Sequence, residues 1–270
     1  MKTIGFVDYY INEWHADNYP AWIEQVCTER GLDYKLTYAW AELDAAPNGK
    51  TTDEWCEKFG VTKCRTLAEL CEKSDCIVIL APSDPEKHLR YAEAVLPYGK
   101  RTYIDKTFAP DFETAQKIFA IAAKHNTPFF SSSALRYATE LDGLEATALA
   151  TTGGGSNIAE YIVHQAEMVI KLLRAEPIRV AVVKTETGYD CFADFANGKQ
   201  ATMTFATGLP FSVSADGQEA VQIRSSFFPA LLADILRFFE DGTLSFDPEE
   251  TLWVMKLREA IIREVTALEE

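Results

Sequence analysis

The chain has 270 residues, with 26 Lys and Arg against 41 Asp and Glu, which gives a formal net charge of −15. Nucleic acid and anionic membranes are poor partners for such a chain, because phosphate contacts need a basic face. Hydrophobic residues make up 47% of the sequence, enough for the packed core of one or two domains.

Two further patterns indicate where the protein works. No uncharged apolar run approaches the roughly 18 residues of a membrane span, and the first ten residues, MKTIGFVDYY, lack the features of a signal peptide. The six cysteines form no C-x-x-C pair and show no metal-ligand spacing. We therefore expect reduced thiols, no metal site, no membrane contact and a cytoplasmic protein.

The first half of the chain alternates apolar strands with helices. A strand is predicted over 3–7, and a helix is predicted to start near Asn18, with Pro20 in its first turn, and to end at Gly31. The elements predicted next are strand 34–41, helices 52–59 and 67–72, strand 76–81, helix 85–96, strand 101–104, helix 112–125 and strand 128–132. Strands separated by helices pair in parallel through right-handed crossovers, so residues 1–132 are predicted to form a Rossmann-like α/β domain with a parallel sheet.

The second half follows a different pattern. After a helix over 159–173, turns that contain glycine separate predicted strands over 178–187, 189–196, 200–207 and 211–215. Helices are predicted over 228–240 and 249–268. Residues 133–270 are therefore predicted to form a shortened α+β domain with an open antiparallel sheet, serving substrate binding or oligomerisation.

The segment after the first strand lacks the glycines of a dinucleotide site. A G-x-G-x-x-G turn lets the backbone approach the pyrophosphate at a helix N-terminus, whereas residues 8–15 read DYYINEWH and contain two acids, Asp8 and Glu13. We expect a long loop here, with three alternatives open. It binds a nucleotide in an altered way through Asp8, Tyr9 and Tyr10, it binds another ligand through its aromatic rings, or its own side chains fill it.

One acid follows the second predicted strand. Glu42 stands where a ribose-binding acid is expected, although a plain surface glutamate is the simpler interpretation. No arginine lies nearby in the sequence to receive a 2′-phosphate, which slightly favours NAD over NADP.

A lysine beside an acid stands at the end of the strand over 101–104. The order of a strand ending in ILAP, a helix opened by His88, then YGK and IDKTFAP resembles the glucose–fructose oxidoreductase/inositol dehydrogenase (Gfo/Idh/MocA) family. The resemblance implies that Lys106 lies beside the nicotinamide and the substrate hydroxyl. It also implies cofactor contacts from Ala81, Pro82, Ser83, His88, Asp105 and Lys106.

A second motif follows three glycines at 153–155. Glu160, His164 and Glu167 lie on one helical face and resemble the family's Asp-x-Gly-x-His-x-x-Asp motif. The resemblance implies that His164 is the catalytic acid or base and that Glu160 orients it or binds substrate. Two structural alternatives remain, namely an ion pair of Lys106 with Asp105 or Glu160, and an ordinary helix histidine at 164. His15 is expected in a loop or on the surface.

These features predict a NAD(P)-dependent oxidoreductase that acts on the hydroxyl or ketone of a sugar-like molecule or polyol, with the absence of any cofactor left open. One alternative is a catalytically silent homologue that serves as a ligand-binding or assembly module, because the phosphate-binding glycines are absent. Another is a redox-neutral enzyme that uses Lys106 and His164 for proton transfer alone. The family resemblance also implies a homo-oligomer, a dimer or tetramer.

Overall fold

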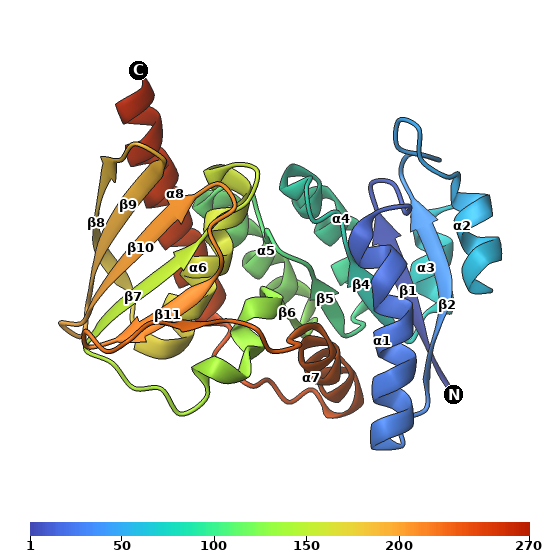
Figure 1. The fold of residues 1–270 in the computed structure, drawn as a ribbon. Coiled ribbons are helices and arrows are strands. Elements are labelled where there is room, and N and C mark those ends of the chain that lie inside the picture. The colour runs from blue at the N-terminus through green and yellow to red at the C-terminus, as the bar shows by residue number, and fades with distance from the viewer. The chain divides into compact units, whose positions relative to one another are not determined.

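The computed structural model describes all 270 residues and divides into two compact units (Figure 1). Unit 1 contains Met1–Ser131 and Phe228–Ser245, and unit 2 contains Ser132–Phe227 and Phe246–Glu270. The structure thus differs from the expected division at residue 132, because a late helix belongs to the first unit. None of the helices combines the length and apolar character needed to cross a membrane.

Unit 1 is built on a parallel six-stranded sheet. Its elements are β1 (Lys2–Asp8), α1 (Trp14–Arg30), β2 (Tyr34–Ala41), α2 (Thr52–Phe59), β3 (Thr62–Lys63), α3 (Leu67–Lys73), β4 (Cys76–Ile79), α4 (His88–Val95), β5 (Thr102–Ile104), α5 (Phe112–His125), β6 (Phe129–Phe130) and α7 (Phe228–Asp241). The strand order is β3-β2-β1-β4-β5-β6, with every pairing parallel. The order reverses between β1 and β4, and ligands of doubly wound sheets bind in the crevice at such a point.

Aromatic packing explains why α7 belongs to unit 1. The ring of Phe228, at the start of α7, stacks on Trp22 of α1 with centroids 4.8 Å apart and planes 8° apart. It also contacts the rings of Trp14 and Tyr19. Because an aromatic side chain removes a large apolar area from water, this cluster attaches α7 to α1 despite their distance in the sequence.

The start of α1 corrects the sequence prediction. The helix begins at Trp14, and Glu13 is its N-cap, so Asn18 is not the cap and Pro20 lies inside the helix. The long loop predicted after β1 is therefore wrong, because only Tyr9–Glu13 separate the strand from the helix. Proline is typical of a first turn, which is why Pro20 suggested a later start.

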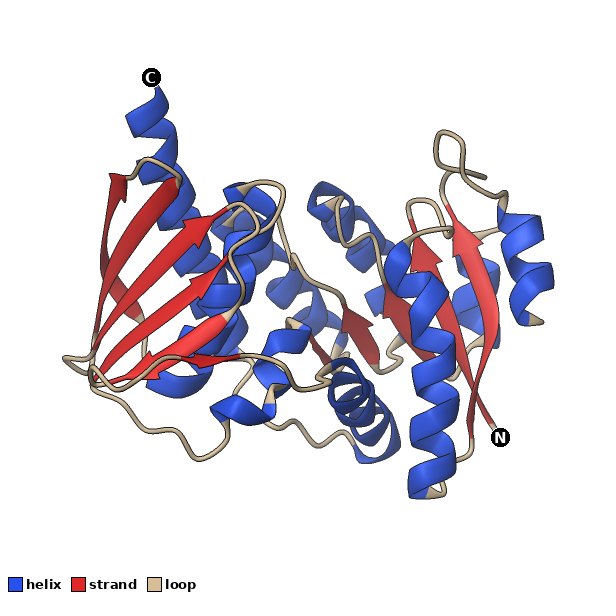
Figure 2. Ribbon diagram, viewed as in Figure 1, coloured by secondary structure: helices blue, strands red, loops and turns tan.

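Unit 2 contains a mixed sheet (Figure 2). Its elements are β7 (Ala148–Gly153), α6 (Ile158–Leu173), β8 (Pro177–Lys184), β9 (Gly188–Phe195), β10 (Gln200–Ala206), β11 (Ser212–Ala215), β12 (Val221–Gln222) and α8 (Glu249–Glu269). The order is β12-β11-β7-β10-β9-β8, in which β7 runs parallel to β10 and the other pairings are antiparallel. The predicted fold class is confirmed, and the sheet is mostly rather than wholly antiparallel.

The strand β7 was missed by the sequence prediction. Its sequence ALATTG contains few of the β-branched and aromatic residues typical of strands. Only Leu149, Thr151 and Gly153 point into the core, and β7 separates β10 from β11, which a simple meander would pair. Helices α6 and α8 pack against this sheet and complete the core of unit 2.

Candidate functional site

A buried carboxylate lies at the point where the strand order reverses. Asp8 ends β1, and its Oδ1 accepts hydrogen bonds from the backbone N–H groups of Tyr9 (2.7 Å) and Ala81 (3.0 Å). Its Oδ2 is buried and has no hydrogen-bond partner. Burial, with the nearby Glu13 carboxylate adding to it, raises the pKa of Asp8 well above its usual value.

Glu13 occupies the N-terminus of α1. Its Oε2 accepts the N–H of His15 at 2.8 Å, and its Oε1 accepts the N–H of Ala16 at 2.5 Å. Burial raises the pKa of Glu13, although the His15 ring and both amides oppose this effect. The first free N–H groups of α1 are thus bonded by the protein's own Glu13 side chain.

The acid beside the lysine is enclosed by protein groups. Asp105 is 1% exposed and bonds to His15 Nδ1 at 2.5 Å, to the Tyr103 hydroxyl at 3.2 Å and to the Tyr19 hydroxyl at 3.3 Å. Burial alone would raise the pKa of Asp105, but the His15 ring, together with the charge and the backbone N–H of Lys106, outweighs burial and holds the pKa below its usual value. Asp105 therefore bonds other groups of the protein, and its expected contact with a cofactor stays a prediction. His15 is buried.

Lys106 follows Asp105 at the carboxyl end of β5 and is half-buried. Its Nζ lies 3.5 Å from the backbone oxygen of Pro82, which follows β4. The contact with Asp105 runs through the backbone, since the Lys106 N–H donates to Asp105 Oδ1 at 2.8 Å. The peptide bond from Lys106 to Thr107 is cis. The Lys106 ammonium thus lies between the ends of two neighbouring strands.

His88 contacts two backbone carbonyl groups. Its side chain is fully buried, with Nδ1 3.0 Å from the oxygen of Phe108 and Nε2 2.6 Å from the oxygen of Leu80. Burial lowers the pKa of His88, and the two carbonyl groups oppose that effect. Both ring nitrogens therefore have backbone partners in this structure, and the expected contact of His88 with a cofactor stays a prediction.

Glu42 lies at the end of β2, beside two hydrogen-bond donors from α4. Its Oε2 accepts the Tyr91 hydroxyl at 2.8 Å and lies 2.5 Å from Arg90 Nη2. The argument that no arginine lies nearby is therefore wrong, because α4 brings Arg90 to Glu42. The preference for NAD over NADP loses its basis.

Two tyrosines follow β1 at the carboxyl edge of the sheet. The rings of Tyr9 and Tyr10 lie 5.6 Å apart, and Lys87 Nζ lies 4.4 Å from the centroid of the Tyr9 ring. Of the residues that follow β4, Ser83 is exposed, whereas Ala81 and Pro82 are buried. Ala81 adopts a left-handed backbone with φ of 59°, which costs a non-glycine residue about 1–2 kcal/mol.

In unit 2, His164 is held by a serine. Its Nδ1 lies 2.7 Å from Ser133 Oγ, and the rings of Tyr161 and Phe211 flank it, each with its centroid 5.8 Å away. Glu160 lies one turn earlier in α6, where its Oε2 is 3.3 Å from Asn157 Nδ2. Asn157 is the N-cap of α6, and its Oδ1 accepts the Glu160 N–H at 2.8 Å. Ser133 is a residue that the sequence analysis missed.

A buried ion-pair network supports this serine. Glu167 accepts the Ser133 N–H at 3.2 Å and lies 2.5 Å from Arg136 Nε, while Arg136 Nη2 lies 2.7 Å from Glu250. All three charged side chains are nearly inaccessible to water. Glu167, the last acid of the motif, is therefore structural, and Arg136 was missed because its partners lie 31 and 114 residues away.

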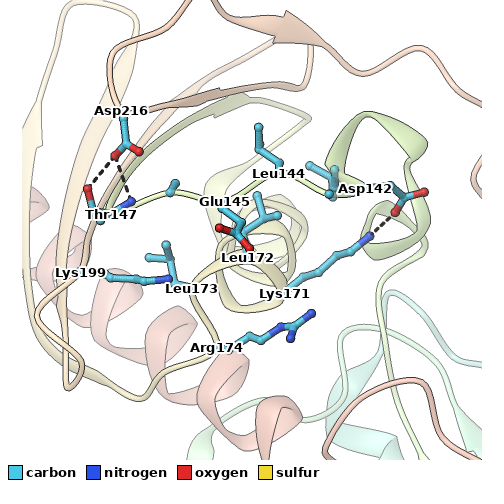
Figure 3. Close-up of a pocket in the computed structure, with 13 residues that line it drawn as sticks. Asp142, Leu144, Glu145, Thr147, Lys171, Leu172, Leu173, Arg174, Lys199 and Asp216 are labelled. Carbon is cyan, nitrogen blue, oxygen red and sulfur yellow. Dashed lines mark hydrogen bonds and ion pairs between the residues drawn. The ribbon is translucent and has the colours of Figure 1, made fainter.

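A separate hollow in unit 2 has a volume of about 710 Å³ (Figure 3). It lies beside the end of α6, where Lys171 is paired with Asp142 at 3.1 Å, and Asp216 accepts hydrogen bonds from the N–H and the hydroxyl of Thr147. None of the predicted site residues lines it. No group of His, Cys, Asp or Glu side chains in the structure is placed to hold a metal ion.

Comparison with known proteins relates one segment of the chain to a described family. Residues 33–133 match the Gfo/Idh/MocA family model, described as an oxidoreductase family with an NAD-binding Rossmann fold. The resemblance inferred from the sequence is therefore confirmed over this segment. No curated protein matches the chain.

Several solved structures share the fold. UDP-N-acetylglucosamine 3-dehydrogenase GnnA from Acidithiobacillus ferrooxidans is 14% identical, with a TM-score of 0.75 over 100% of this chain and 99% of that one. GenD2 from gentamicin A biosynthesis, in complex with NAD, is 12% identical, with a TM-score of 0.74 over 98% and 95%. An oxidoreductase from Thermotoga maritima is 14% identical, with a TM-score of 0.76 over 97% and 96%. At such low identity, these likenesses show the fold alone.

Proposed function

We propose that the protein is an oxidoreductase that acts on a hydroxyl or ketone of a sugar-like molecule or polyol, with NAD or NADP as the hydride carrier. The observation that carries the proposal is the position of Lys106, whose ammonium lies at the carboxyl edge of a sheet that matches an NAD-binding Rossmann family. The similar fold of UDP-N-acetylglucosamine 3-dehydrogenase supports a sugar-like substrate.

Lys106 would hold charge at the reacting oxygen. When the carbon that bears the hydroxyl gives up a hydride, the hydroxyl must also lose its proton, and a cation beside that oxygen stabilises the charge that develops. The Pro82 carbonyl, 3.5 Å from the Lys106 ammonium, limits where the cation can lie. The backbone bond between Lys106 and the buried Asp105 anchors the residue without neutralising the ammonium directly.

His164 would supply the acid or base. Its Nδ1 lies 2.7 Å from Ser133 Oγ, a contact that would orient the imidazole for proton exchange with substrate. The aromatic rings of Tyr161 and Phe211 restrict the orientation of the imidazole. Glu160, whose carboxylate faces its own N-cap, would contribute to substrate binding rather than to the orientation of His164.

A second candidate function follows from the start of α1. The Glu13 carboxylate bonds the helix N–H groups that a pyrophosphate would use, and Asp8 lies close behind it. As arranged, these residues do not fit a pyrophosphate at the usual turn. This observation favours a catalytically silent homologue that binds a ligand or assembles with a partner.

Substitution of the lysine separates the two candidates. In an oxidoreductase, Lys106→Met lowers kcat by about 100-fold or more, the usual magnitude for a positioned acid–base group. The matched control is Lys117→Met, because Lys117 is an exposed lysine of α5 paired only with Glu113. The assay follows absorbance of the reduced nicotinamide with a panel of sugars, polyols and keto-sugars. No turnover by the wild type with any of them would favour the silent homologue.

We also propose that the protein is a homo-oligomer of the cytoplasm. The outer face of the unit 2 sheet exposes Val183 and Phe192, next to small residues such as Ala181, and a partner would remove this apolar area from water. All six cysteines are free thiols, which fits a reducing compartment. Light scattering tests the assembly, and a monomer at all concentrations would contradict it.

A further inference from the structure

In unit 1, the N-terminus of α1 lies where an anion commonly binds in this kind of fold. A side chain of the protein itself already occupies this position. In doubly wound folds, the helix after the first strand points its free N–H groups into the crevice where the strand order reverses. Here that helix is α1, and the crevice lies between the ends of β1 and β4. An empty helix N-terminus at this place would attract a phosphate because of its unpaired amides and its dipole.

Four backbone amides at this crevice donate to the protein's own carboxylates. The N–H groups of His15 and Ala16 bond the two oxygens of Glu13, and those of Tyr9 and Ala81 bond one oxygen of Asp8. Glu13 presents its two oxygens to adjacent amides as a phosphate group would. The amides are therefore satisfied before any ligand arrives.

Asp8 places a second buried carboxyl group in this crevice. Its Oδ2 is buried without a hydrogen-bond donor, although buried carboxylate oxygens are normally paired. Glu13 and Asp105 are the acids that face it, and the His15 ring is bonded to Asp105 rather than to Asp8. A pyrophosphate placed here would meet two carboxylates and none of these four donors.

We propose that Glu13 stands in for the nucleotide pyrophosphate and thereby sets the affinity of the chain for NAD and NADP. The proposal rests on the proposed function, because it assumes that a nicotinamide nucleotide is the ligand of this crevice. For the nucleotide to bind at α1, the Glu13 side chain must leave the amides of His15 and Ala16. Nucleotide binding and helix capping by Glu13 are then mutually exclusive.

Three substitutions separate the charge of Glu13 from its hydrogen bonds. The extended backbone of the N-cap, with φ of −135° and ψ of 172°, suits each of them. Glu13→Gly removes both the charge and the side-chain acceptor, Glu13→Asn keeps an acceptor without charge, and Glu13→Asp keeps both. Glycine, asparagine and aspartate are all accepted N-caps, so the helix is retained, and thermal unfolding verifies that each variant is folded.

The experiment is calorimetric titration of the wild type and the three variants with NADH and NADPH. We expect Glu13→Gly to bind at least about tenfold more tightly than the wild type, a change of about 1.4 kcal/mol. Glu13→Asn should be intermediate, and Glu13→Asp should match the wild type. Equal affinity in all four proteins overturns the inference and leaves the cofactor part of the proposed function standing.

Two further outcomes separate the inference from the proposed function. If no protein binds either nucleotide, the inference and the cofactor part of the function both fail, since something other than Glu13 keeps the nucleotide out. If Glu13→Gly binds more tightly, yet neither it nor the wild type oxidises or reduces any sugar or polyol, the inference holds and the oxidoreductase activity fails.

Discussion

The two units differ in whether their buried ionisable side chains are paired with groups of opposite charge. In unit 2, Arg136 lies between Glu167 and Glu250, so that each buried charge has an opposite charge within hydrogen-bond distance. In unit 1, Asp8 lies near Glu13, and one oxygen of Asp8 has no partner. Buried charges that are paired hold a fold together, whereas an excess of one sign raises the pKa values of its members and is more typical of a binding site.

The pairing of buried charges distinguishes structural residues of the predicted site from residues more typical of binding. Glu167 belongs to the motif that suggested catalysis, but its partners make it a structural residue. Asp8 was singled out only because glycines were missing, yet it lies at the reversal of the strand order with an unpaired oxygen. A motif therefore locates a region, and the pairing of charges indicates what each residue does.

The largest loss of stability is expected from a substitution in the buried ion-pair network of unit 2. Arg136→Met leaves Glu167 and Glu250 buried without a cation, so the free energy of unfolding should fall by about 3–5 kcal/mol. Urea unfolding measures the change. The exposed Arg224, whose guanidinium bonds Gln222, is the control, and Arg224→Met should stay within about 0.5 kcal/mol of the wild type.

A triple variant sharpens this comparison. Replacing Arg136, Glu167 and Glu250 together by Met, Leu and Leu removes every charge of the network, and buried ion networks replaced in this way are often neutral or stabilised by about 1–4 kcal/mol. The triple variant should therefore recover most of the stability lost in Arg136→Met. If it is as unstable as the single variant, packing rather than unpaired charge causes the loss.

The sequence predicted the layers of the fold because their signals are local. Apolar runs separated by helices require parallel pairing, and this pattern located most strands of unit 1. The start of α1 was missed because glutamate is an uncommon N-cap and Pro20 resembled a first-turn residue. The strand β7 was missed because its sequence is rich in alanine.

Within the candidate site, the sequence located residues but not their partners. Lys106 and His164 were found through motifs, yet His15 lies 90 residues from Asp105, and Arg136 lies 114 residues from Glu250. Such pairs are created by the packing of distant elements, which no local pattern encodes. Burial, as at His88, is also a property of the folded chain.

The excess of negative charge in unit 1 makes stability depend on pH. Because the pKa of Asp8 is raised in the folded protein, ionisation of Asp8 opposes folding, so its contribution is complete at low pH and is lost as the pH rises through the folded-state pKa. Asp8→Asn removes this titration. Between the unfolded and folded pKa values, the stability of the variant relative to the wild type should grow by about 1.4 kcal/mol per pH unit.

Urea unfolding from pH 4 to pH 8 measures this difference. The groups facing Asp8 are Glu13, Asp105 and the amides of Tyr9 and Ala81, so Asp8→Asn also relieves Glu13 of a neighbouring charge. The exposed Asp33, which pairs only with the chain's amino group, provides the control Asp33→Asn. Parallel stability curves for wild type and Asp8→Asn would show that Asp8 is neutralised by some other group.

The smallest effect is expected at the serine that holds His164. Ser133→Ala removes the hydroxyl 2.7 Å from His164 Nδ1, and one such hydrogen bond is worth about 0.5–1.5 kcal/mol, which corresponds to at most about a tenfold loss of kcat. KM should stay near the wild-type value if the serine only orients the imidazole. Ser133→Thr keeps a hydroxyl and should restore kcat. A variant that loses stability without any change in kcat would make this hydrogen bond structural, and unit 2 would then hold His164 for packing rather than for proton transfer.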